Sequence, residues 1–134
     1  MKRVLVFGTF DLLHPGHVFI LKFAATFGQV YISLSPDRMV KFYKKREPSF
    51  SYHKRYLRLS RFKPIYKIVV SDKRPLTYNI LDKVRPDVII LGHDQLLLRP
   101  NIIQALKEKK LNCRIILAPK YHRDIYASSL LAIT

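Results

Sequence analysis

Short runs of valine, isoleucine and leucine alternate along this chain with longer segments of helical period. This alternation is typical of successive strand and helix units around a parallel sheet. Runs so uniformly apolar indicate strands that are covered on both faces. The predicted strands are Arg3 to Phe7, Val30 to Leu34, Lys67 to Val70, Val88 to Leu91 and Arg114 to Leu117.

The segments between these runs carry the signals of helices. Pro15 suits the first turn of a helix, where its missing N–H costs nothing, and Gly28 suits the position just past that helix's end. The other predicted helices are Tyr52 to Arg61, Thr77 to Val84, Ile102 to Lys109, and a short last helix in "SSLLAIT" capped by Ser128. The stretch from Lys44 to Lys54 is predicted to be a loop.

These elements predict an α/β protein with a Rossmann-like, doubly wound sheet of about five parallel strands and helices on both faces. Its 134 residues are the size of one ordinary domain, so we expect a single domain over residues 1–134. In such a sheet the ligand site lies outside the carboxyl ends of the strands.

The charge of the chain is strongly unbalanced, with 25 Lys and Arg against 9 Asp and Glu and a formal net charge of +16. This balance indicates an anionic partner, either nucleic acid, a membrane surface or a phosphorylated small molecule, and charge does not choose among them. The single cysteine, Cys113, cannot form an internal disulfide, and we expect it to be a small buried residue at the start of a strand. No apolar run is long enough to span a membrane or to act as a signal peptide, which predicts a cytoplasmic protein.

The stretch "GTFDLLHPGH", Gly8 to His17, follows the first predicted strand and opens the first helix. The N–H groups and dipole of a helix start attract anions, and the two glycines allow backbone to approach a ligand closely. His14 and His17 can both donate hydrogen bonds to one phosphoryl group, while Asp11 can orient a neighbour or a metal. The stretch therefore predicts a phosphate site. The alternatives are a capping or packing role for His14 and a metal site, for which a third close ligand is missing.

The same ten residues resemble the HxGH signature of the nucleotidyltransferase superfamily, in its cytidylyltransferase-like branch. The resemblance implies in-line attack by an acceptor phosphate on the α-phosphorus of a nucleoside triphosphate, with pyrophosphate leaving, magnesium assisting and no covalent enzyme intermediate. It implies that His14 and His17 are catalytic and hold the α- and β-phosphate region. It also implies a nucleotide-binding wall made by Gly8, Thr9, Phe10 and Asp11, with Asp11 reaching the acceptor side as well.

The segment Arg38 to Lys67 holds 11 of the 25 basic residues and one acidic residue, Glu47. Members of the family carry a basic pair in this region, which implies a catalytic Lys44 and a nucleotide-binding Arg46, with Lys45 as the alternative. The resemblance also implies that Arg55 binds the phosphate of the acceptor, although His53 stands where an acidic residue is usual. The competing interpretation is a solvated surface, which we expect for Arg58 and Arg61.

Two further motifs follow the family pattern. Asp94 in "LGHDQ" occupies the Gly-x-Asp position, which implies a nucleotide ligand, and the following Gln95 resembles the archaeal FAD synthetase group. Enzymes that act on glycerol phosphate tend to have an Asp-Trp pair there. In "YHRDIYASSLLAIT" the resemblance implies that Ser128 and Ser129 bind the β- and γ-phosphates and that Arg123 contacts the acceptor.

The leading hypothesis is therefore an FMN adenylyltransferase or close relative, which takes ATP or CTP with Mg²⁺, and FMN or another phosphorylated acceptor. The alternative enzyme is a cytidylyltransferase for glycerol 3-phosphate or another phospho-alcohol. A different class of protein, a basic nucleic-acid-binding protein or an inactive nucleotide binder, stays open. We expect no metal ligand set from the protein, a homodimer as in related enzymes, no membrane contact, and no main role in nucleic-acid binding.

Overall fold

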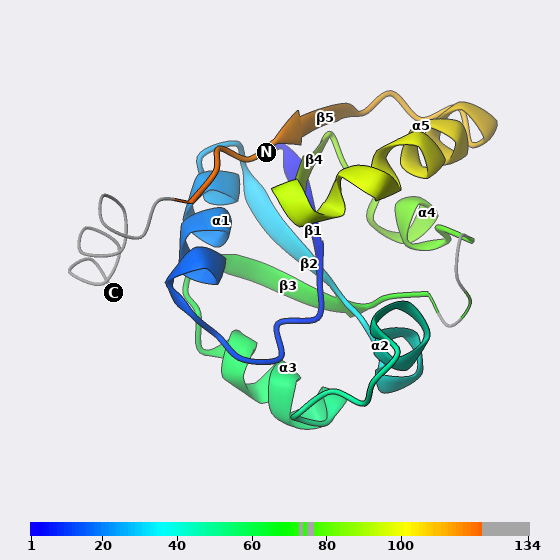
Figure 1. Ribbon diagram of the computed structural model, residues 1–134. Coiled ribbons are helices and arrows are strands. Elements are labelled where there is room, and N and C mark those ends of the chain that lie inside the picture. Colours follow the sequence, from blue (N-terminus) through cyan, green and yellow to red (C-terminus); the bar gives the residue numbers. More distant parts are fainter. Residues whose placement is uncertain (73, 75–76, 122–134) are drawn as a thin grey trace.

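The computed structural model describes residues 1–72, 74 and 77–121, over which strands and helices alternate along the chain (Figure 1). All strand pairs are parallel, and the order across the sheet is β3-β2-β1-β4-β5. The strands are β1 (Arg3–Gly8), β2 (Gln29–Leu34), β3 (Ile65–Val70), β4 (Val88–Leu91) and β5 (Arg114–Leu117). The five predicted strands are confirmed, and the parallel sheet with its helices confirms the predicted fold class.

Helices cover the sheet on two sides (Figure 1). On one face α1 and α3 pack against inward-pointing residues such as Val6, Ile32 and Ile90. On the other face α4 and α5 pack against Leu5 and Ile89. This alternation along each strand is the reason that the strands read as continuous apolar runs. The helices are α1 (Pro15–Ala25), α2 (Asp37–Lys44), α3 (Tyr52–Ser60), α4 (Ile80–Val84), α5 (Arg99–Glu108) and the 3₁₀ helix η1 (His93–Leu98).

Several helix boundaries differ from those predicted. The helix α2 and the turn η1 were not predicted, because α2 has only eight residues, three of them basic, and η1 lacks a helical repeat. The predicted helix Thr77 to Val84 begins only at Ile80, since Tyr78 has a φ of 51°, outside the helical region. The helix α5 begins at Arg99 instead of Ile102, because Pro100 fits its first turn.

The strand order reverses between β1 and β4, which lie side by side in the centre of the sheet. The elements that follow these two strands pack on opposite faces of the sheet, and the carboxyl ends at such a reversal are where ligands bind in folds of this kind. The motif from Gly8 to His17 leaves β1, and the stretch from Gly92 to Gln95 leaves β4. Among the described residues no helix is long and apolar enough to cross a membrane.

Cys113 directly precedes β5 and is half-buried. Burial, with a smaller contribution from Asp87, raises the pKa of its thiol to about 11. The thiol is therefore protonated at neutral pH and behaves as a small apolar group rather than as a nucleophile.

Candidate active site

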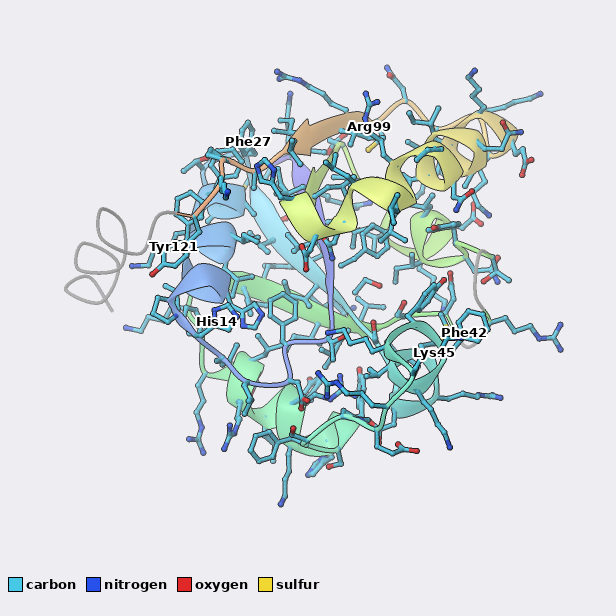
Figure 2. The ribbon with its side chains drawn as sticks, viewed as in Figure 1. His14, Phe27, Phe42, Lys45, Arg99 and Tyr121 are labelled. Atoms are coloured by element: carbon cyan, nitrogen blue, oxygen red, sulfur yellow. The ribbon has the colours of Figure 1, made fainter. Side chains whose placement is uncertain are left out.

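Two histidines stack on each other at the start of α1. The ring centroids of His14 and His17 are 3.8 Å apart, with an interplanar angle of 23°. His14 is the N-cap of the helix, and its Nδ1 accepts a hydrogen bond of 3.1 Å from the backbone N–H of Gly16 (Figure 2). Because Nδ1 accepts, a neutral His14 carries its proton on Nε2, which is left to donate to a ligand.

The two glycines of the motif make room for these rings. A Cβ on Gly16 would lie 2.9 Å from Cε1 of His14, so a side chain there would push the capping imidazole out of place. A Cβ on Gly8 would lie 2.3 Å from Cε2 of Phe10, whose buried ring packs 5.0 Å from that of His17. The spacing of the motif therefore serves the packing of the two imidazoles.

His17 is neutral at physiological pH. Burial lowers the pKa of its imidazole to about 4, and the charges of His14 and Lys44 lower it further, while Asp94 and the backbone of Leu12 oppose the shift. Its Nδ1 is buried and has no hydrogen-bond partner in the part of the chain that the structure describes. Lys44 and Asp94, two of the predicted site residues, act electrostatically on this imidazole in opposite directions.

Asp11 joins the basic loop between α2 and α3 to the stretch from Gly8 to His17. Its carboxylate accepts hydrogen bonds from the backbone N–H groups of Ser49, at 2.6 Å, and Phe50, at 2.8 Å. Burial opposes ionisation, yet these two bonds and the charge of Arg55 give a net lowering of the pKa of Asp11. The guanidinium of Arg46 lies 3.9 Å from the same carboxylate and is largely exposed. In this state Asp11 is a positioning residue for the loop that carries Arg46.

Arg55 does not reach toward an acceptor, contrary to the expectation from the sequence. Its side chain is fully buried, and four of its N–H donors bond inside the protein. These bonds run to the carbonyls of Thr9, Ser35 and Phe50 and to the carboxylate of Asp37. The physical reason is that Arg55 lies on the inward face of α3, so it joins the loops that leave β1 and β2.

Gln95 bridges the two strand ends at the candidate site and was not among the predicted site residues. Its Oε1 accepts from the N–H of Gly92 at 3.0 Å, and its Nε2 donates to the carbonyl of Phe7 at 2.8 Å. One amide thus joins the ends of β4 and β1. The signal for it was its place directly after Asp94, which is exposed in the first turn of η1.

The remaining predicted residues have simpler positions. The carbonyl of Thr9 turns inward to Arg55, and Lys44 and Lys45 end α2 as exposed residues. The described residues contain no group of three His, Cys, Asp or Glu side chains that could hold a metal ion. The predicted residues Arg123, Ser128 and Ser129 lie outside the described residues.

The chain matches the family model described as cytidylyltransferase-like over residues 5–132. It is 35% identical over 117 residues to the FAD synthase of Methanococcoides burtonii, covering 87% of this chain and 80% of that protein. It is 34% identical over 124 residues to the FAD synthase of Korarchaeum cryptofilum, covering 90% of this chain and 83% of that protein.

Solved structures share the fold. A lipopolysaccharide core biosynthesis protein from Thermoplasma volcanium superimposes with a TM-score of 0.84 at 24% identity, covering 91% of this chain and 99% of that chain. Pantoate-beta-alanine ligase from Francisella tularensis gives a TM-score of 0.63 at 15% identity, covering 90% of this chain and 60% of that chain. At these identities the likeness supports the fold alone.

Proposed function

The chain belongs to the cytidylyltransferase-like family and is a nucleotidyltransferase, and we propose that it transfers the adenylyl group of ATP to FMN. The stacked pair of His14 and His17 at the start of α1 is the observation that carries the chemistry. The archaeal FAD synthases among its relatives support the choice of ATP and FMN as substrates. The products would be FAD and pyrophosphate.

In this proposal a phosphate oxygen of FMN attacks the α-phosphorus of ATP. A bond forms between that oxygen and phosphorus, the bond to the bridging oxygen breaks on the opposite side, and pyrophosphate leaves with the electron pair. The protein supplies alignment and charge stabilisation rather than a nucleophile. Nε2–H of His14 donates to the phosphate region, and neutral His17 adds a second imidazole without adding a charge.

Lys44 and Arg46 supply positive charge beside the leaving pyrophosphate. Both are exposed, and the loop that carries Arg46 is tied to the motif by Asp11. We assign the adenine base to a hollow between β4, β5 and the start of α5, and we assign the ribose to the carboxylate of Asp94 in η1. The hollow is lined by Leu91, Leu96, Arg99, Ile115 and Leu117.

Magnesium fits this site as a companion of the triphosphate rather than as an ion held in a protein cage. The described residues offer no cluster of three ligands, and both oxygens of Asp11 are engaged by backbone N–H groups. Mg²⁺ commonly binds through substrate phosphates, waters and one or two carboxylates. When bound, the ion would neutralise charge on the phosphates. The expected homodimer and cytoplasmic location stay predictions.

A pyrophosphate-release screen tests the proposal. The purified chain is incubated with Mg²⁺ and either ATP or CTP, crossed against FMN, glycerol 3-phosphate, phosphocholine and phosphopantetheine. We expect release with ATP and FMN together, with FAD identified by chromatography, and loss of release in His14→Ala and His17→Ala with unchanged circular dichroism. Turnover of CTP with glycerol 3-phosphate and none with FMN would identify the cytidylyltransferase alternative instead. Silence with every pair would favour an inactive nucleotide binder.

A further inference from the structure

The basic segment from Arg38 to Lys67 includes α3 as well as the loop that carries Arg46. On α3 the side chains of Lys54, Arg58 and Arg61 recur at the spacing of one helix face, and we call them the α3 stripe. A separate face of α3 carries the buried Arg55 and Leu59, whereas the three residues of the stripe are exposed to solvent. Figure 2 shows long side chains with nitrogen tips along the margin below α3.

The α3 stripe is not neutralised by neighbouring acids. In the described part of the chain no carboxylate lies within 4.0 Å of its three cations. The two acids nearest in sequence are used elsewhere, Glu47 by Lys41 at 3.3 Å and Asp37 by Arg55 at 2.6 Å. Surface charges that stabilise a fold through ion-pair networks need both signs, so this stripe is not such a network.

The α3 stripe also offers a flat surface. The guanidinium of Arg58 lies over the ring of Phe50, with Cζ 4.0 Å from the centroid, which holds the guanidinium plane in place. On the neighbouring α2 the ammonium of Lys45 lies 5.6 Å from the centroid of Phe42, a ring that is 52% exposed (Figure 2). Cations interleaved with rings are the pattern that binds single-stranded nucleic acid, because phosphates meet the charges and bases stack on planar groups.

We propose that the α3 stripe of Lys54, Arg58 and Arg61 binds single-stranded nucleic acid as a second activity of this chain, outside the nucleotidyl-transfer site. The partner is chosen over an anionic membrane because a lipid headgroup offers charge but no base to stack on Arg58. The proposal does not depend on the identity of the acceptor, so it can fail or stand independently of FAD synthesis.

Fluorescence anisotropy with a labelled U12 RNA, measured at 50 to 300 mM salt, tests the proposal. Each phosphate contact in a single strand contributes about 0.7 to the slope of log K against log salt. The triple variant Lys54→Gln, Arg58→Gln, Arg61→Gln is expected to weaken binding at least 10-fold at 100 mM salt and to reduce that slope by about 2. Its nucleotidyl-transfer rate is expected to stay unchanged.

A matched variant removes the same charge elsewhere: Lys2→Gln, Lys83→Gln, Lys107→Gln, three exposed lysines away from α3. Arg58→Lys keeps the charge and removes the guanidinium plane. We expect little change in affinity from the matched variant, and from Arg58→Lys a several-fold loss with an unchanged slope. Three outcomes would each overturn the proposal. The first is an equal loss of affinity in both triple variants, and the second is displacement of the RNA by millimolar ATP in parallel with active-site occupancy. The third is binding to phosphatidylserine vesicles but not to RNA.

Discussion

Arg55 and Asp37 form an ion pair of 2.6 Å in which the guanidinium is fully buried and the carboxylate stays partly exposed. The pair is one of four bonds by which Arg55 joins the loops after β1 and β2 to the start of α3. A buried guanidinium needs this many acceptors, because an unpaired buried charge is costly. The residue that resembled a substrate contact in the sequence is therefore an internal anchor of the active-site loops.

Replacement of Arg55 by lysine tests this anchoring role. Lysine keeps the charge but cannot bond three carbonyls and a carboxylate from one plane. We expect the free energy of unfolding to fall by about 2 to 4 kcal/mol, measured by urea denaturation. Arg61→Lys on the exposed side of the same helix should change it by less than about 0.5 kcal/mol. If Arg55 instead contacted the acceptor, Arg55→Lys would raise the KM for FMN and leave stability unchanged.

Gly16→Ala should separate activity from stability. Alanine favours a helix by about 1 kcal/mol over glycine, so the fold should not be weakened. Its Cβ would meet the ring of His14 at 2.9 Å and break the bond from Gly16 N–H to Nδ1. We expect at least a 10-fold loss of kcat with a thermal midpoint within about 3 °C of the original. An active Gly16→Ala enzyme would show that the His14 cap is not needed for catalysis.

Gly8→Ala is the contrasting change. The added Cβ would lie 2.3 Å from the buried ring of Phe10, which cannot move without disturbing the core around His17. We expect destabilisation of about 1 to 3 kcal/mol, measured by urea denaturation, together with lower activity. Full stability in this variant would mean that the Phe10 ring has room to shift.

The sequence was sufficient to predict the sheet and the helix start at Pro15, because both depend on local patterns. Apolar runs mark the strands, and the spacing of His14, Gly16 and His17 fixes which groups meet at a helix start. The roles of Arg55 and Gln95 depend on contacts with residues 46 and 88 positions away, to Thr9 and Phe7. No local pattern reports such contacts, so a buried anchor and a substrate ligand look alike in the sequence.

Gln95→Glu tests the link between the ends of β1 and β4. The change keeps an acceptor for the N–H of Gly92 but sets a carboxylate oxygen against the carbonyl of Phe7, where the amide now donates. We expect a loss of about 1 to 3 kcal/mol in the free energy of unfolding and a higher KM for ATP, measured by denaturation and steady-state kinetics. Gln104→Glu on α5, whose exposed amide donates to Glu108 at 3.0 Å, is the control for loss of a surface amide bond, and equal effects from both variants would exclude a bridging role for Gln95.

The depressed pKa of His17 makes stability depend on pH in a defined window. The folded protein holds this imidazole neutral down to about pH 4, whereas an unfolded histidine takes up a proton near pH 6.5. Between these values the unfolded state binds more protons, so the free energy of unfolding should fall as the pH drops from 6.5 to 4, by at most about 3 kcal/mol from this group. Subtracting the urea-derived profile of His17→Gln from that of the original chain isolates the contribution of His17. A flat difference over this window would show that His17 is not buried as a neutral ring. The assignment of His17 as an uncharged donor beside the phosphates would then fail as well.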